Sequence, residues 1–376
     1  MYVYNVNYFY LQLKQKREVI VFMCIILFSL SALAQDDKVA PKYSNEFLSI
    51  GVGAEAFGKG NAVVAQTDNA YSGYWNPAGL TQINKWLDVG LMHSDYFGGI
   101  AKYDCLALAH TIDKKSTIGG TFIRFAVDDI PNTTQLIDQQ GNIDYDRITT
   151  FTAADYALLL SYARKLKIKG LSVGGNFKIV HRKVGSFAKS WGFGLDGGAQ
   201  YTSKNYKLGV MVRDMTSTFN AWVFTLDTQT KDVFAQTGNT IPSNGLELTL
   251  PKVILAAYGK LPVGNRGFYT AGEIDVHISS DGRRNVLMKT DLFSFDPHVG
   301  IEFSFKNYVS IRGGVSNFQY VKEFDDSQKL NFQPNIGLGL NVKNFYLDYA
   351  FTDLGDVSVA LYSHVISLRI KLDKPN

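Results

Sequence analysis

Three ionisable residues alternate along one stretch of the chain, at a spacing that could support acid–base chemistry. Glu273, Asp275 and His277 occur at positions i, i+2 and i+4, so a β-strand would project all three side chains to one face. In an enzyme, carboxylates beside an imidazole can transfer protons. In a β-barrel the same spacing gives a polar stripe along the lumen. We favour the stripe, because Ile274 and Val276 alternate with it, and we expect its partners among Arg213, Arg312, Arg369 and Lys371.

Other residue patterns that could carry chemistry are weaker. The six histidines are scattered, and none has ligand spacing to a carboxylate or a cysteine, so we expect no metal site. We expect no nucleophile elbow of the Gly-x-Ser-x-Gly type. The glycines of GVGAEAFGKG (51–60) lack the strand–helix context of a phosphate loop. The sequence therefore predicts no enzyme and no cofactor.

The composition is that of a chain with many strands and one apolar face. Of the 376 residues, 13% are aromatic and only 19% are charged, whereas soluble domains have about a quarter. The net charge of +4 is small, and the basic residues form no cluster with aromatic ones, so we expect no nucleic-acid partner.

The first 34 residues have the pattern of a secretory signal peptide. Three basic residues at 14–17 precede the apolar run 19–30, and Ala32-Leu33-Ala34 is a small-x-small cleavage site. A membrane-anchoring helix is the alternative, but the run is shorter than the ~20 residues that a spanning helix needs. Cleavage would leave one cysteine, Cys105, in an alternating apolar stretch. We expect a packed or lipid-facing thiol.

Long segments of alternating polarity predict membrane-spanning strands. In WGFGLDGGAQY (191–201) one face is apolar with an aromatic residue at each end, and the other is small or polar, as a barrel strand between two headgroup layers requires. Segments of alternating polarity also occur in soluble β-sandwiches. The segments of this chain, however, are longer than the five or six residues that are usual for a strand in a globular protein. The fourteen expected strands lie near 86–93, 98–110, 117–127, 154–164, 170–183, 191–202, 206–214, 248–259, 267–278, 297–305, 308–316, 332–342, 345–351 and 360–372.

The connections between these strands alternate in length. Most connections after even-numbered strands are short, and three of them share a Lys-Asn tip, at SKNY (203–206), FKNY (305–308) and VKNF (342–345). Asn tolerates positive φ, so each fits a two-residue hairpin. Long connections are expected at 128–153, 215–247 and 279–296. Short turns at one end and long loops at the other are typical of an outer-membrane β-barrel.

Residues 47–80, FLSIGVGAEAFGKGNAVVAQTDNAYSGYWNPAGL, resemble the start of the PorV/PorQ family of outer-membrane proteins and, more distantly, of FadL-type fatty-acid channels. The resemblance continues through segments such as FIRFAVDDIPNT (122–133), MVRDMTSTFNAW (211–222) and YSHVISLRIKL (362–372). It implies a FadL-like barrel of fourteen strands (85–376) with an N-terminal plug (35–84). One departure from the resemblance is Lys59 in AFGKGNA (56–62), a segment in which relatives often have a Met-Gly-type pairing.

The same resemblance implies a function in the type IX secretion system of Bacteroidetes, in the outer membrane of a Gram-negative cell. The implied partners are a large translocon barrel, the C-terminal signal domains of cargo, attachment-complex proteins and outer-membrane lipid. The alternatives are a FadL-like channel for hydrophobic small molecules and an enzyme acting on lipid A, for which no nucleophile is seen.

Two groups of residues are candidate sites. The first is the plug motif AYSGYWNPAGL (70–80), where Pro77 fixes φ and the Ala78-Gly79 pair would let the backbone pass close to the wall. We expect Tyr74, Trp75, Asn76, Pro77 and Gly79 to form the hinge between plug and barrel.

The second candidate site is an expected extracellular loop. Phe219, Trp222, Phe224 and Phe234 lie in the 215–247 connection. They either fold over the barrel mouth or form a docking surface for translocon or cargo, since exposed aromatic patches mark interaction sites. Both interpretations remain open.

Overall fold

The computed structural model describes residues 44–96, 98–136, 142–280, 284–322, 326–352 and 362–374. The expected signal peptide (1–34) lies outside these residues. No helix in the part of the chain described is long and apolar enough to cross a membrane.

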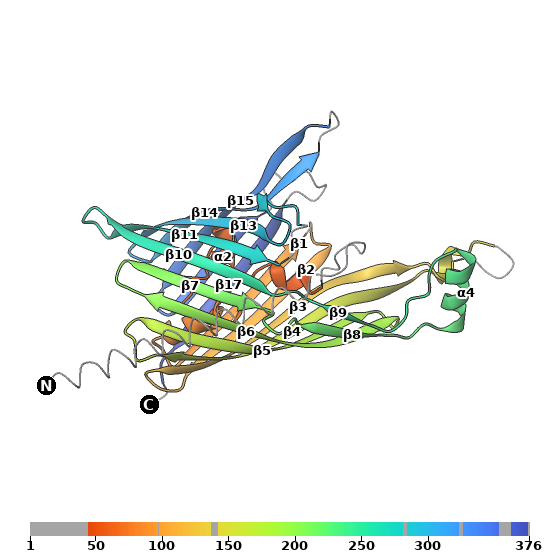
Figure 1. Ribbon diagram of the computed structural model, residues 1–376, viewed down its shortest axis with the longest axis horizontal. Helices are drawn as coiled ribbons and strands as arrows, with labels where there is room; N and C mark the ends of the chain where they lie inside the picture. The colour runs from red at the N-terminus through yellow and green to blue at the C-terminus, as the bar shows by residue number, and fades with distance from the viewer. Residues whose placement is uncertain are drawn as a thin grey trace. The chain divides into compact units, whose positions relative to one another are not determined.

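Fourteen antiparallel strands close into a barrel (Figure 1), and β1 pairs with both β2 and the last strand, β17. The wall strands are β1 (Leu87–Tyr96), β2 (Ala101–Thr111), β3 (Ser116–Asn132), β4 (Thr149–Lys165), β5 (Leu171–Val184), β6 (Ala188–Thr202), β7 (Tyr206–Arg213), β10 (Lys252–Val263), β11 (Phe268–Ser279), β13 (Ser294–Phe305), β14 (Val309–Lys322), β15 (Gln328–Val342), β16 (Phe345–Thr352) and β17 (Ser363–Leu372). Each predicted strand is present, so the fourteen-stranded fold is confirmed.

The alternating sequence produces this wall because its two faces meet different surroundings. On β6, Trp191 is 52% exposed on the outer face, while its neighbour Ser190 is buried on the lumen side. The same division on β5 exposes Phe177 and buries Lys178. Closing the sheet leaves no unpaired edge, which a strand in lipid could not tolerate.

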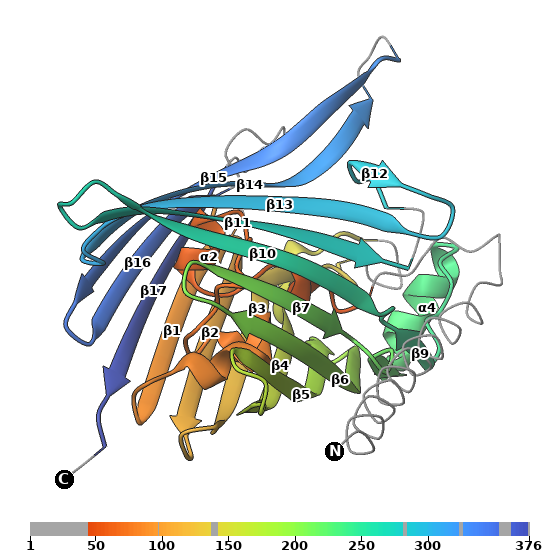
Figure 2. The ribbon, with the colours of Figure 1, turned by 60° about the vertical axis from the view of Figure 1, so that its left-hand side comes forward.

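The long connections are more structured than predicted. The 215–247 segment contains strands β8 (Phe219–Phe224) and β9 (Gly245–Leu248) and helix α4 (Thr228–Gln236). The 128–153 loop is shorter than expected, because β3 and β4 extend to Asn132 and Thr149 around the 3-10 turn η4 (Tyr145–Arg147). Strand β12 (Met288–Lys289) lies in the third long connection, which was expected at 279–296. Figure 2 shows the β14–β15 hairpin projecting beyond its neighbours.

The Lys-Asn turns follow the prediction in part. Lys306 and Asn307 both have positive φ, at 49° and 57°, as a type I′ turn requires. In the 342–345 turn it is Lys343 that has positive φ, at 58°. Lys204 and Asn205 have no positive φ, so that turn is of another type.

The N-terminal segment fills the lumen as a plug (Figure 2) made of short helices: η2 (Glu46–Ser49), α2 (Ala54–Gly58), α3 (Ser72–Trp75) and η3 (Pro77–Gln82). Its apolar side chains pack against lumen-facing residues such as Tyr103 and Ile123. Cys105 belongs to this core and is 3% exposed, so the thiol is packed inside rather than lipid-facing.

Candidate functional site

Asn76 connects two parts of the plug to the barrel wall. Its side-chain Oδ1 accepts from the Ala78 amide, at 3.2 Å, which caps helix η3. The Nδ2 group donates to the carbonyl oxygens of Val64 in the plug, at 3.2 Å, and Ala199 on β6, at 3.1 Å. The residue is fully buried, so losing the side chain would leave these backbone groups without partners.

Tyr74 and Trp75 tie the C-terminal half of the plug to its N-terminal half. The Tyr74 hydroxyl donates to the carbonyl of Leu48, at 2.5 Å, and Trp75 Nε1 donates to that of Val52, at 2.9 Å. The two rings meet edge to face, and the guanidinium of Arg213, from the end of β7, lies 4.3 Å from the Tyr74 ring centroid. Desolvated cation–π contacts of this kind contribute about 2 kcal/mol.

The close approach of plug to wall depends on glycines of the wall, which corrects the role expected for Ala78-Gly79. A Cβ on Gly79 would overlap Thr67, a plug residue, instead of the wall. On the wall, a Cβ on Gly174 would lie 2.6 Å from the Pro77 carbonyl carbon, and one on Gly198 would overlap Asn76. The plug backbone therefore rests directly on β5, and the Asn76 side chain rests on β6.

We predict that Trp75→Ala loosens the plug without unfolding the barrel. The change removes a ring that is 3% exposed and the hydrogen bond to Val52, at a cost of about 3–5 kcal/mol. Pro77→Ala should have a smaller effect, about 1 kcal/mol, through the unfolded state. Hydrogen exchange of plug amides and bilayer conductance measure both effects. If both variants match the wild type in both measurements, the wedge interpretation is wrong.

The acidic stripe on β11 binds the plug backbone and not the arginines expected from the sequence. Asp275 Oδ2 accepts from the amides of Val63 and Val64, at 3.0 and 3.1 Å. Glu273 accepts from the Ala65 amide through Oε1, at 2.5 Å, and from the Gln66 amide through Oε2, at 3.1 Å. This stretch of plug forms no regular helix, so its N–H groups need partners, and two lumen carboxylates supply them.

His277, the third residue of the stripe, stacks on His298 of β13 with ring centroids 4.1 Å apart. His298 Nδ1 contacts the carbonyl oxygen of Gly60, at 2.8 Å. The predicted lumen stripe is thus a plug-binding surface.

Lys59 lies at the centre of a buried ion cluster. Its Nζ is 2.8 Å from Glu55 Oε1 on helix α2 and 3.0 Å from Glu302 Oε2 on β13. Arg312 on β14 binds Glu302 at 2.7 Å and Asp348 on β16 at 2.6 Å. The five side chains join the plug to three wall strands.

Charges in this cluster hold the plug's ionisable groups in their charged forms. Burial opposes ionisation of Glu55, but Lys59, Arg312 and Arg369 outweigh it and keep the pKa of this carboxyl well below its usual range. Burial likewise opposes charging of Lys59, yet Glu302 and Glu55 raise its pKa above the ordinary value. Both groups therefore remain charged at neutral pH.

A cavity of about 310 Å³ lies between this cluster and the short turns. Its lining is polar and carries charges of both signs, including Lys207, Lys260 and Lys371 on the wall and Asp68 on the plug. A second cavity, of about 200 Å³, is lined by Lys252, Arg284 and other polar residues. Neither resembles the mainly apolar pocket that binds a hydrophobic molecule.

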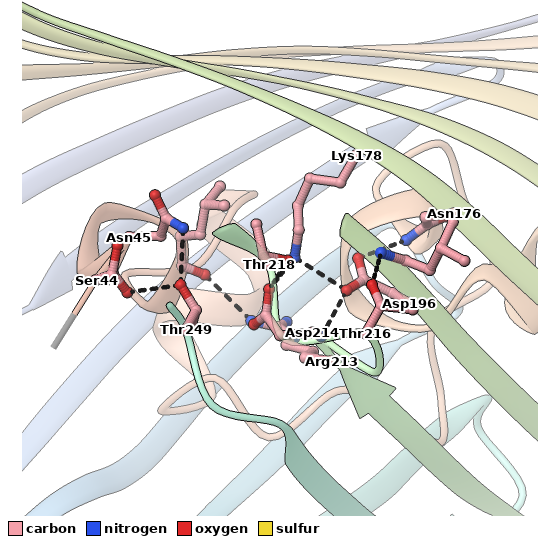
Figure 3. Close-up of polar contacts among 12 residues, drawn as sticks. Ser44, Asn45, Asn176, Lys178, Asp196, Arg213, Asp214, Thr216, Thr218 and Thr249 are labelled. Carbon is pink, nitrogen blue, oxygen red and sulfur yellow. Dashed lines mark hydrogen bonds and ion pairs between the residues drawn. The ribbon is translucent and has the colours of Figure 1, made fainter. Parts of the chain in front are cut away.

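The wall is interrupted between β7 and β8, and a polar cluster closes the interruption (Figure 3). Lys178 Nζ binds Asp196 at 3.0 Å and Asp214 at 2.5 Å, and the Thr218 hydroxyl donates to Asp214 at 2.6 Å. Both strands pair with β6. The Met215 amide donates to the Leu195 carbonyl at 2.8 Å, so backbone pairing continues across the break.

The start of the plug reaches the same region. Asn45 Nδ2 donates to the Thr249 hydroxyl at 2.8 Å (Figure 3), and Asn220 Nδ2 donates to the Ser44 hydroxyl at 2.8 Å. The Thr249 amide in turn donates to the Thr218 carbonyl at 2.8 Å. The interruption therefore forms no lateral gap in the described part of the wall.

Comparison with protein-family models identifies the family. Residues 33–241, more than half of the chain, match the model of the type IX secretion system protein PorV. The chain belongs to the PorV family. It is an outer-membrane β-barrel component of the type IX secretion system. A search of curated proteins gave no match.

Solved structures show that this PorV-family barrel has the FadL-like fold. The CymD monoaromatic hydrocarbon channel has a TM-score of 0.53 at 12% identity, over 89% of this chain and all of the channel. The toluene transporter TodX of P. putida gives 0.52 at 13% identity, over 86% and 99%. The toluene transporter TbuX of Ralstonia pickettii gives 0.50 at 10%, over 86% and 98%. Family and fold are those of a secretion or transport barrel, not of an enzyme.

The four aromatic residues predicted for the extracellular loop do not form one surface in the PorV-family barrel. Phe219 lies on the outer face of β8, where its ring packs at a tilt against that of Phe193 of β6. Trp222 and Phe224 lie on the opposite face of the same strand, where Trp222 stacks on Phe224 and Arg182 covers its ring at 5.2 Å. Phe234 is on helix α4. Phe219 is separated from Trp222 and Phe224 because successive side chains of a strand point to opposite faces.

The Gly-x-Ser-x-Gly spacing does occur in the chain, contrary to the sequence prediction, at residues 170–174. The motif lies at the start of β5 and not at a strand-to-helix turn. Ser172 is 1% exposed, and its hydroxyl accepts a hydrogen bond from Thr81 of the plug, at 2.8 Å. The motif therefore contributes another contact between plug and wall.

Proposed function

We propose that this barrel binds the translocon and the C-terminal signal domains of cargo and passes the cargo to a surface attachment complex. The observation that carries the proposal is the fixed plug. Hydrogen bonds and ion pairs join it to wall strands around the circumference, including β1, β5, β6, β7, β11, β13 and β17. A folded polypeptide cannot pass such a lumen, so the barrel would act through its surface.

The long-loop end offers that surface. Strands β8 and β9 extend the wall there, and helix α4 lies beyond them (Figure 1). The partly exposed Phe234 on α4 and the Trp222–Phe224 pair inside the rim supply aromatic contacts of the kind enriched at interfaces. This end contains all four aromatic residues predicted for partner binding.

Site-specific photo-crosslinking would test the proposal in the native host. A photoreactive phenylalanine analogue at Phe234 should crosslink to cargo signal domain or translocon, whereas the analogue at Tyr308, in a short turn at the other end, should not. Deleting the gene should leave cargo with C-terminal signal domains inside the cell. Normal export in the deletion strain, or equal crosslinking at both sites, would contradict the proposal.

A channel for hydrophobic small molecules is the second candidate, and the fold favours it because the solved structures include hydrocarbon channels. Two observations favour the secretion function over the channel. Both cavities have a polar lining, and the interruption between β7 and β8 is closed. Uptake of a radiolabelled fatty acid or toluene that depends on the protein would support the channel.

A further inference from the structure

The two ends of the barrel carry opposite charge. The six short turns lie at 112–115, 166–170, 203–205, 264–267, 306–308 and 343–344, and together they hold eight basic residues and one acidic residue. The segments that join strands at the other end hold fourteen acidic and five basic residues. The small net charge of the chain conceals this difference.

We call the eight basic residues of the short turns the basic turn ring. Its members are Lys114, Lys115, Lys167, Lys169, Lys204, Arg266, Lys306 and Lys343. All eight are exposed. Within the described residues none of them pairs with a carboxylate, and the acidic member of the turns, Asp113, accepts hydrogen bonds from the amides of Lys115 and Ser116.

A belt of aromatic side chains lies next to the ring on the outer face. Tyr206 and Tyr308 are 48% and 58% exposed, and Tyr162 and Phe345 are exposed similarly. Aromatic belts of this kind mark the headgroup level of a membrane. Each of these aromatic residues lies two to five positions in the chain from a ring residue, at Lys204, Lys306, Lys343 or Lys167, so the charges of the ring reach the lipid headgroups or the water just beyond.

We infer that the basic turn ring binds the headgroups of anionic phospholipids in the leaflet at the short-turn end. Every one of the six turns contributes at least one positive charge, so the charge surrounds the barrel. Lipid headgroups also surround a barrel on all sides, whereas a protein partner would contact one side. Each basic residue near an anionic surface adds a favourable contribution.

Tryptophan quenching by brominated lipids can measure this binding at each end separately. Trp86 precedes β1 at the short-turn end, and Trp191 lies on the outer face near the other end. Trp75 is buried in the plug, and Trp222 lies on the inward face of β8. The W191F variant therefore reports on lipid at the basic end, and the W86F variant is its matched control.

The full-length mature protein would be placed in phosphatidylcholine vesicles with increasing brominated phosphatidylglycerol. We expect a preference for the anionic lipid at Trp86 on the order of five-fold, falling with added salt, and no comparable preference at Trp191. Replacing all eight ring residues with glutamine should abolish the preference at Trp86.

Equal lipid preference at the two tryptophans would overturn the inference, as would a preference that survives neutralisation of the ring. If the variant with eight replacements fails to fold, a smaller variant can be used, in which only Lys167, Lys169, Lys204 and Lys306 are replaced. A lipid preference at Trp86 that is unchanged in this variant and unaffected by salt in the wild type would overturn the inference.

Discussion

Replacing Lys59 with methionine is expected to release the plug from β13 and lower its stability by about 3–5 kcal/mol, because breaking a buried ion pair leaves uncompensated charge. Lys59 is 3% exposed and pairs with both Glu55 and Glu302. Methionine retains most of the side-chain volume, so the loss would come from charge and not from a cavity. Exchange of the plug amides at 63–66 should accelerate by about two to four orders of magnitude.

The contribution of this pair should change little between pH ~5 and pH ~10. The depressed pKa of Glu55 means that its stabilisation is present above the unfolded-state pKa and is lost as pH falls through the folded value. The raised pKa of Lys59 means that its stabilisation is present below the unfolded-state pKa and is lost as pH rises through the folded value. The difference in opening free energy between the wild type and the Lys59→Met variant should therefore be the same at pH 6 and pH 8.

Lys85→Met is the matched control. Lys85 pairs with Asp373 at 2.7 Å, but both side chains are partly exposed, so this pair should contribute less than about 1 kcal/mol. A second variant, Glu55→Gln with Lys59→Met, should recover part of the loss because it removes one of the unpaired carboxylates. Equal exchange rates in the Lys59 and Lys85 variants would show that the cluster does not hold the plug.

The strands were predictable because a membrane imposes alternation on every residue that crosses it. Beyond the lipid, β3 and β4 continue to Asn132 and Thr149, where neither face of the hairpin needs to be apolar. No alternating pattern marks these extensions, nor β8 and β9. The sequence therefore predicted the number of wall strands and underestimated the length of several.

The contacts of the plug were not predictable, because they join residues far apart in the chain. We expected arginines to pair with Glu273 and Asp275, but both carboxylates accept hydrogen bonds from backbone amides at 63–66 of the plug. Lys59 seemed only a departure from a family pattern, since nothing near it in sequence identifies Glu302. Arg213 was considered as an ion-pair partner, whereas its position over Tyr74 and Trp75 depends on where β7 ends.

Replacing Gly314 with valine is expected to displace the plug more than any other single change in the wall. A Cβ at Gly314 would overlap the backbone of Lys59 and Gly60, and backbone atoms cannot move aside as a flexible side chain can. Overpacking of a core by side chains costs about 1–3 kcal/mol, so a collision with backbone should cost at least that much. Planar-bilayer conductance and sensitivity of cells to a large antibiotic should both rise.

Gly313→Val is the control for this prediction, because successive residues of a strand point to opposite faces. A Cβ at Gly313 has its nearest neighbour at 3.7 Å, on Ile301, a residue of the outer face, and an added valine there meets lipid. The Gly313 variant should therefore keep the conductance of the wild type. If the Gly314 variant stays closed as well, the plug can move aside while sealing the lumen. In that case the ion cluster around Lys59, and not the fit of backbone to wall, determines closure.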